Sequence, residues 1–218
     1  MLSDMIIYIM EWIGTVSFAV SGALVAIGCS LDIFGVVTVG CITAVGGGII
    51  RDILLGNVPP KIFDNPIILL VALITSVLVF VIAYIFRKRF KAFQAATNSY
   101  NVFFDALGLA AFSITGVETV CISDHSANIV LAITLGVITG VGGGIIRDVL
   151  VNEKPYVLTK HIYAVVSVVS CSVYYLLSFH YNHKIIATFF VLIFTVLIRL
   201  LAAKFRWGLP KIKIDEEK

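Results

Sequence analysis

Two Arg-Asp pairs stand where charged side chains are rare. The octapeptide VGGGIIRD occurs at 45–52 and again at 141–148, which places Arg51-Asp52 and Arg147-Asp148 near the ends of long apolar runs. Charged side chains inside a membrane are costly unless they are paired or hydrated, and by default they indicate a functional path. We therefore take both pairs as candidate charges at the mouths of a transport pathway.

Two further acids are candidates for ion pairs with these arginines. Glu11 opens the first apolar run and Asp105 opens the fourth. Pairing of Glu11 with Arg51, and of Asp105 with Arg147, would place opposite charges at each end of one pathway. The alternative is that the Arg-Asp pairs lie at the membrane surface and extend their charged groups into water. Glu118, late in the fourth run, is expected at the outer interface.

The elements that must position these residues are membrane helices. Of the 218 residues, 60% are hydrophobic and 13% are charged, and the mean hydropathy is +1.05. A helix of about 20 apolar residues spans the hydrocarbon core, and the period-2 alternation of a membrane barrel is missing. The sequence predicts an all-α membrane protein with seven transmembrane helices, at about 5–26, 33–55, 66–86, 102–120, 129–151, 162–179 and 184–203.

Catalytic and metal chemistry find little support in the sequence. Its four cysteines have no metal-binding or redox spacing and are expected as small buried side chains: Cys29, Cys41, Cys121 and Cys171. No serine-hydrolase, zinc-protease or nucleotide-binding motif occurs. We expect no enzyme activity, metal or cofactor. A lipid-modifying membrane enzyme, the third functional class we consider, would need a catalytic cluster that we do not find.

The positive charges orient the helices. If successive loops face opposite sides, one side holds twelve lysines and arginines and the other holds two, Lys61 and Lys184. The twelve are Arg87, Lys88, Arg89, Lys91, Lys154, Lys160, Arg199, Lys204, Arg206, Lys211, Lys213 and Lys218. Because cytoplasmic loops carry the excess of positive charge, we expect the amino terminus outside and the tail, 205–218, in the cytoplasm. The slightly basic composition then reflects this topology, and no nucleic-acid partner is expected.

The doubled octapeptide belongs to a longer internal repeat. VGGGIIRD recurs at an offset of 96 residues, and FAVSG at 18–22 matches FSITG at 112–116 at an offset of 94. Each unit holds three helices, an odd number, so the second unit enters the membrane from the opposite side. This construction predicts an inverted repeat with a site near the membrane midplane. The predicted units are repeat one at about 5–86, repeat two at about 101–180 and a seventh helix at about 184–203, within one membrane domain of 1–204.

Glycine triplets interrupt the second and fifth apolar runs. They are Gly46, Gly47 and Gly48, and Gly142, Gly143 and Gly144. Each glycine costs about 1 kcal/mol against alanine in a helix interior, and the first triplet begins about 20 Å along its helix. We expect these positions to unwind or bend beside a pathway, because exposed backbone at that depth is tolerated only inside protein or beside water. The alternative is that the small residues merely allow close helix packing.

A short half-helix should follow each triplet. The first would cover about 49–55 and end at Gly56, and its partner would end at Asn152. Glycine and asparagine both suit a left-handed residue that caps a helix. Two triplets, each followed by Arg-Asp, favour a pathway over packing alone.

The doubled GGGIIRD, with FAVSG and FSITG before its two copies, resembles the bacterial family whose repeat is called the glycine-transporter domain. That family is similar to a branch of the trimeric intracellular cation channel (TRIC) superfamily. The resemblance covers about residues 5–203 and implies two inverted helix triplets plus one helix, a homotrimer, and a separate pore in each protomer. It also implies that the second and fifth helices kink at the glycine triplets. Short loops and tails favour a bacterial inner membrane.

The resemblance leaves two functions open, because the structural kinship implies potassium conduction and the family name implies glycine uptake. A broken helix offers carbonyl oxygens to a cation and N–H groups to a carboxylate, so a zwitterion could use both. No acidic ring or TVGYG-like filter occurs, and sharp potassium selectivity is not expected. We predict a TRIC-type channel for monovalent cations, potassium and sodium. The alternative is a secondary transporter for glycine or another small zwitterion. The expected partners are membrane lipids and two further copies of the chain.

Overall fold

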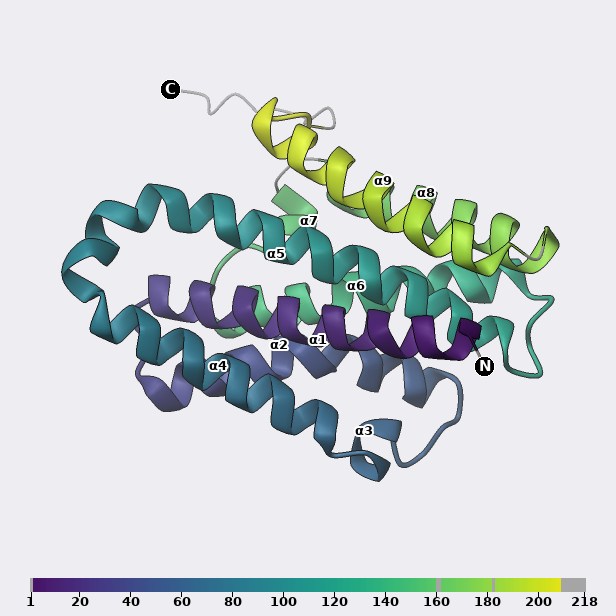
Figure 1. Ribbon diagram of the computed structural model, residues 1–218, viewed down its shortest axis with the longest axis horizontal. Coiled ribbons are helices and arrows are strands. Elements are labelled where there is room, and N and C mark those ends of the chain that lie inside the picture. Colours follow the sequence, from purple (N-terminus) through teal and green to yellow (C-terminus); the bar gives the residue numbers. More distant parts are fainter. Residues whose placement is uncertain (1, 160–161, 182, 209–218) are drawn as a thin grey trace, which may run out of the picture.

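Long helices packed side by side make up the protein, as the computed structural model in Figure 1 shows. The structure describes residues 2–159, 162–181 and 183–208, with backbone alone at 2–4, 7, 87–98, 159 and 180. Within these residues, six helices are long and apolar enough to cross a membrane, and a shorter apolar helix covers Tyr163–Phe179. The elements are α1 (Leu2–Gly28), α2 (Ile33–Leu54), α3 (Lys61–Asp64), α4 (Ile67–Ile85), α5 (Arg87–Cys121), α6 (Ile129–Leu150), α7 (Tyr156–Thr159), α8 (Tyr163–Tyr175), the π-helix η1 (Leu176–His180) and α9 (Lys184–Lys204).

The predicted apolar runs all lie on helices, and the largest difference concerns α5. This helix begins at Arg87, well before the predicted start near residue 102. Residues 87–101 mix charged and polar side chains with a few apolar ones, so an apolar run could not locate them, but lysine, arginine, alanine and glutamine are good helix formers. The short helices α3 and α7, each preceded by proline, are also absent from the prediction. The predicted tail beyond residue 208, with Lys211, Lys213 and Lys218, lies outside the described residues, as does Lys160.

The helices α2 and α6 cross at their glycine triplets. A Cβ on Gly47 would overlap the carbonyl oxygen of Thr139, and a Cβ on Gly143 would overlap that of Thr43. The two triplets also contact each other directly, since a Cβ on Gly142 would lie 3.4 Å from the Cα of Gly47. Two backbones can approach this closely only where side chains are missing. The glycines at 47 and 143 therefore serve helix packing.

The predicted unwinding at the triplets is wrong. The α-helix α2 runs without a break from Ile33 to Leu54, and α6 does so from Ile129 to Leu150. The physical reason is that a continuous helix keeps its backbone hydrogen bonds inside the membrane, where water cannot replace them. The kink that the resemblance implies stays an expectation. The left-handed caps are confirmed, since φ is 76° at Gly56 and 59° at Asn152.

The two halves of the chain make equivalent contacts. Gly14 faces the ring of Phe112, and Gly108 faces the ring of Phe18. These two rings lie against each other with centroids 5.2 Å apart. The helix starts match as well, because Asp32 accepts from the third residue of α2 and Asn128 accepts from that of α6. Gly14 and Gly108, and Phe18 and Phe112, therefore make reciprocal contacts.

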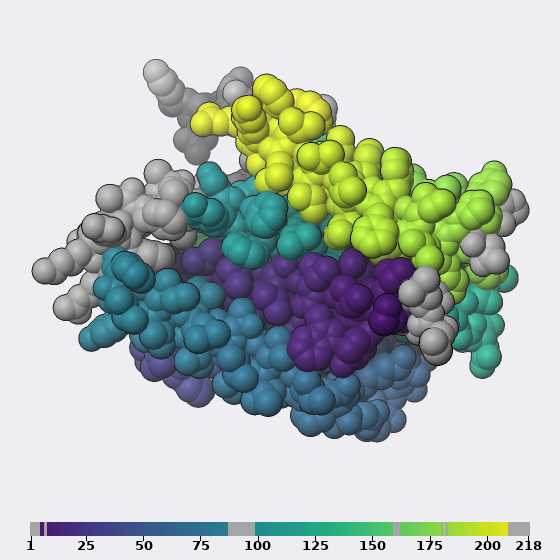
Figure 2. Space-filling model, viewed as in Figure 1, coloured from purple at the N-terminus to yellow at the C-terminus, as the bar shows by residue number. Residues whose placement is uncertain are grey.

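The helix α1 lies between two layers of the bundle. Figure 2 shows it as a purple band on the visible face, with blue α4 on one side and yellow α9 on the other. Exposed aliphatic and aromatic side chains cover much of α4 and α9, including Leu70, Ile82, Phe190 and Leu197. Such faces suit lipid tails as their solvent. The polar side chains gather instead between α1, α2, α5, α6 and α9, where the candidate site lies.

Candidate functional site

Each Arg-Asp pair is joined by its own side chains. Arg51 Nε donates to Asp52 Oδ1 at 2.9 Å, and Arg147 Nε donates to Asp148 Oδ1 at 2.8 Å. The second oxygen of each carboxylate accepts from the backbone N–H that opens α3 or α7, at 3.1 and 2.8 Å. The side chains of Arg51 and Arg147 are buried, so the alternative of surface charges that extend into water is wrong. Each aspartate thus orients its arginine and fixes the loop that follows the helix.

Asp105, in α5, joins two arginines from other helices. Its Oδ1 accepts from Arg147 Nη1 at 2.9 Å, and its Oδ2 accepts from Arg199 Nη2 at 3.3 Å. Arg147 Nη1 also donates to Ser21 Oγ at 2.6 Å, and the Ser21 hydroxyl donates to Asn101 Oδ1 at 2.7 Å. All five side chains are buried. We call these five residues the Asp105 network. The predicted pairing of Asp105 with Arg147 is confirmed.

Arg199 is a site residue that the sequence analysis placed wrongly. The charge count assigns Arg199 to the cytoplasmic face, but this residue is only 1% exposed. Its guanidinium carbon lies 4.1 Å from the centroid of the Tyr163 ring, within the range of a cation–π contact. Its Nε and Nη1 have no hydrogen-bond partner within the described part of the chain. The signal that could have found it is its isolation, because it is the lone charge in the apolar run 185–203.

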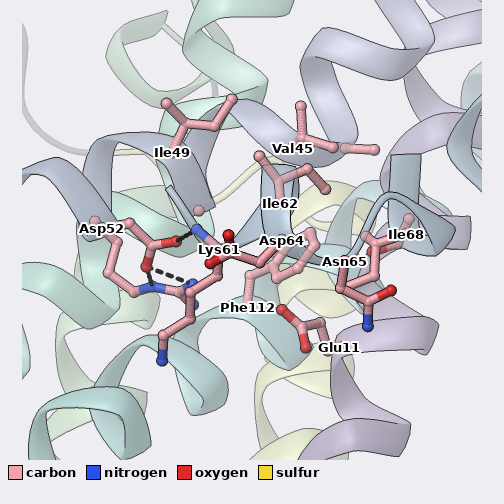
Figure 3. Close-up of a pocket in the computed structure, with 14 residues that line it drawn as sticks. Glu11, Val45, Ile49, Asp52, Lys61, Ile62, Asp64, Asn65, Ile68 and Phe112 are labelled. Atoms are coloured by element: carbon pink, nitrogen blue, oxygen red, sulfur yellow. Dashed lines mark hydrogen bonds and ion pairs between the residues drawn. The ribbon is translucent and has the colours of Figure 1, made fainter. Parts of the chain in front are cut away.

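A cavity of about 320 Å³ lies beside the other arginine, between α1, α2, α3 and the start of α4. Figure 3 shows polar and apolar side chains around it, among them Glu11, Asp52, Lys61 and Asp64. Lys61 and Asp64 are exposed, so the cavity opens to solvent at α3. We call it the Glu11 cavity. Glu11 precedes Ser21 of the Asp105 network by ten residues, about 15 Å along α1.

The predicted pairing of Glu11 with Arg51 is wrong. Both residues line the Glu11 cavity, but no ion pair joins them among the described residues. Arg51 uses Nε and Nη2 to bind Asp52, whose interactions are the dashed lines beside the label Asp52 in Figure 3. This preference follows from distance, since Asp52 is its neighbour in the same helix. Within the part of the chain that the structure describes, Glu11 is left in the cavity as an acid without an ion-pair partner.

The third glycine of each triplet lies beside a charged cluster. Gly48 lines the Glu11 cavity, where a Cβ would lie 3.8 Å from Arg51 Nη2. A Cβ on Gly144 would lie 3.8 Å from both Arg147 Nη2 and Asp105 Oδ1. These are ordinary van der Waals distances, unlike the overlaps at the second glycine. The glycines of each triplet therefore have different surroundings. The middle ones, Gly47 and Gly143, allow the helices to pack closely, and the third ones, Gly48 and Gly144, leave room beside the arginines.

Glu118 is buried and forms an ion pair with the partly exposed Lys184, and its place at the outer interface stays a prediction. Glu118 is 0% exposed. Glu118 Oε1 lies 2.6 Å from Lys184 Nζ, and Oε2 accepts from the Tyr174 hydroxyl at 3.1 Å. Lys184, the first residue of α9, thus neutralises the buried acid. This pair ties α5 to α8 and to the start of α9.

Metal ligands do not gather in the described part of the chain, where no group of three His, Cys, Asp or Glu side chains could hold an ion. The four cysteines are free. Cys171 is buried as predicted, whereas Cys29 is exposed because it lies in the turn after α1. The polar chemistry of the molecule is therefore that of paired charges and hydroxyl groups.

Comparison with known proteins finds relatives over nearly the whole chain. The family described as Glycine transporter matches twice, at residues 8–84 and 102–178. The UPF0126 inner membrane protein YadS of Escherichia coli K12 is 38% identical over 216 residues, which are 97% of this chain and 99% of that protein.

Solved structures of cation channels have the same fold. A TRIC cation channel studied for its conductance matches with a TM-score of 0.81 at 36% identity, over 96% of this chain and 98% of that one. The trimeric intracellular cation channel orthologue from Rhodobacter sphaeroides matches with a TM-score of 0.81 at 32% identity, over 92% of this chain and 98% of that one.

Proposed function

The chain belongs to the Glycine transporter family, and we propose that it is a TRIC-type channel that conducts monovalent cations through a pathway inside each protomer. Its fold matches that of solved TRIC cation channels at more than 30% identity, which supports a cation channel. A multi-pass place in the inner membrane is supported by the name of the Escherichia coli relative and by the six apolar helices among the described residues.

One observation carries the proposal: two charged clusters lie along α1, a solvent-open one at Glu11 and a buried one around Asp105. The Glu11 cavity opens to solvent beside α3. The Asp105 network lies about 15 Å further along α1. Gly48 lines the first cluster and Gly144 contacts the second. We infer a pathway from the Glu11 cavity, along the glycine faces of α2 and α6, to the Asp105 network, which closes it in this structure.

The charges of the Glu11 cavity favour cations. Arg51 is neutralised by Asp52 at 2.9 Å. The exposed Lys61 and Asp64 offset each other at the rim. Glu11 then leaves one net negative charge inside the cavity. A cleft of one sign with low-dielectric walls raises the local concentration of counter-ions, here potassium or sodium.

We propose further that the two halves form an inverted repeat of three helices each, with α9 as a seventh membrane helix. Two observations support this: the family matches the chain twice, and the glycine–threonine and glycine–phenylalanine contacts are reciprocal, with Gly47 against Thr139 and Gly143 against Thr43, so that α2 and α6 are antiparallel where they meet. Because Arg199 is buried in α9, the charge count of twelve to two becomes eleven to two. The bias still favours an outer amino terminus and a cytoplasmic tail.

The second candidate function is transport of glycine or another small zwitterion. It is favoured by the mixed charges of the Glu11 cavity, where Lys61 faces the same space as Glu11 and Asp64. An ammonium group could meet the acids while a carboxylate meets the lysine. A carrier would need both ends to close in turn, and a channel would not.

A homotrimer with one pathway in each protomer completes the proposal, in line with the trimeric description of the Rhodobacter relative. Crosslinking in mild detergent should then stop at three chains. Function is tested by reconstitution into liposomes with potassium flux and labelled glycine uptake measured side by side. The proposal predicts potassium flux without glycine uptake, and glycine uptake without potassium flux would favour the second candidate.

A further inference from the structure

Arg147 and Arg199 both bind Asp105, but they are held very differently. Arg147 has partners in Asp105, Asp148 and Ser21 at distances of 2.6 to 2.9 Å. Arg199 has one hydrogen bond, to Asp105 at 3.3 Å, and otherwise lies over the Tyr163 ring. Of the two contacts that Asp105 makes with guanidinium groups, the one to Arg199 is therefore the easier to break.

Buried donors of Arg199 also favour its release. Its Nε and Nη1, like the Tyr163 hydroxyl, have no hydrogen-bond partner in the described part of the chain. An unsatisfied buried donor raises the free energy of the state that contains it. If α9 shifts and water enters, these donors gain partners. The closed arrangement and a hydrated one are thus two states that a small change can rebalance.

Arg199 has no counterpart at the Glu11 end of the proposed pathway. It lies on α9, outside both repeated segments. The other charged residues of the two clusters that lie on α1, α2, α5 and α6 each have a counterpart in the other half of the chain. No second arginine approaches Glu11 among the described residues, and the Glu11 cavity is open. One end of the bundle is therefore open and the other carries an additional positive charge.

We propose that Arg199 is the latch of the Asp105 end: its contact with Asp105 holds α9 against α5 and keeps the pathway closed, and the pathway opens when that contact breaks. This role rests on the proposed function, because it supposes that ions pass through the pathway when the contact is broken. Arg199 acts through Asp105 and is a positioning residue for the gate. Removing it leaves Asp105 and Asp148 against Arg147 alone, a net negative charge that cations can enter.

The first test compares Arg199→Gln with Lys184→Gln. Both substitutions remove an ion pair between α5 and α9, but Lys184 binds Glu118 at the far end of α9, away from the Asp105 network. Potassium flux per folded protein in liposomes should rise at least about fivefold in Arg199→Gln, as for ordinary coupling between two states, and stay unchanged in Lys184→Gln. Arg199→Lys, which keeps the charge but loses the planar fork, should give an intermediate rise. An equal rise in Lys184→Gln would overturn the latch, because general loosening of α9 would then explain it.

A second measurement does not depend on ion flux. A cysteine placed at Gly144 fits beside Arg147 and Asp105, and it reports on opening through its rate of modification by a water-soluble thiol reagent. Mass spectrometry of the peptide that carries residue 144 separates it from the exposed Cys29. Modification should be faster when Gly144→Cys is combined with Arg199→Gln than with Lys184→Gln.

The two readouts separate the latch from the function. Faster modification without potassium flux in any variant would keep the latch and contradict the cation channel. Unchanged modification and unchanged flux in folded Arg199→Gln would overturn the latch while leaving the channel in place. Correct folding is checked by the oligomer size in detergent.

Discussion

At the scale of single residues, the two arginines of the repeat are each paired locally. Arg51 and Arg147 each bind the aspartate that follows them in sequence. The repeat predicted that Asp105 pairs with Arg147, and the structure confirms that ion pair, whereas Arg51 binds Asp52 and not the equivalent Glu11. The contacts of Arg199 and Glu118 could not be predicted, because each depends on how α9 packs against α5. A repeat carries no information about a helix that lies outside it.

Asp105→Asn should lower the stability of the protein far more than Glu11→Gln, because Asp105 is paired with two arginines and Glu11 has no ion-pair partner among the described residues. Asp105→Asn leaves two buried guanidinium groups with less negative charge, and loss of one partner of a buried pair costs about 3–5 kcal/mol of unfolding free energy. Glu11 has no ion-pair partner among the described residues, so Glu11→Gln should change stability by less than about 1 kcal/mol. Thermal unfolding of both purified variants in mild detergent measures the difference. Equal losses of stability would mean that Glu11 is also paired.

At the scale of helices, the apolar runs predicted the six helices of the described residues that are long and apolar enough to cross a membrane, and the caps at Gly56 and Asn152 followed from residue type. The polar first half of α5 was not predictable from hydropathy. The glycine triplets were ambiguous, because a flexible turn and a close helix contact require the same residue. Only the position of Thr139 and Thr43 opposite them decides that the middle glycines pack helices.

Alanine at Gly47 and at Gly48 should have opposite consequences. A methyl group at residue 47 overlaps the backbone carbonyl of Thr139, which cannot rotate away, so α2 and α6 must separate. Such overpacking costs about 1–3 kcal/mol or more, and we expect loss of the folded oligomer on size-exclusion chromatography. At residue 48 the methyl group has room beside Arg51. Gly48→Ala should fold normally and lower ion flux, and a folded Gly47→Ala with normal flux would contradict the packing role.

At the scale of the whole molecule, the account places two repeats in opposite orientations across the membrane. Single cysteines at Asp4 and at Lys213, in a chain whose four native cysteines are serines, should respond to an impermeant thiol reagent from opposite sides. The eleven-to-two charge bias predicts labelling at residue 4 from outside, and at residue 213 only after permeabilisation. Labelling of both from one side would require an even number of spans and would remove the inverted repeat.

The central claim, that cations pass through the Glu11 cavity, is tested most directly by the potassium conductance of Glu11 variants in a planar bilayer. Asp124→Asn is the matched control, because Asp124 is an exposed acid in the loop after α5, on the same proposed face but away from the cavity. At about 0.01 M KCl, where the Debye length is about 30 Å, conductance should fall by about tenfold or more in Glu11→Lys and by less in Glu11→Gln. At about 1 M KCl the differences should largely vanish, because charges are then screened within about 3 Å. Equal conductance of Glu11→Lys, Asp124→Asn and the unmodified chain at low salt would contradict the account.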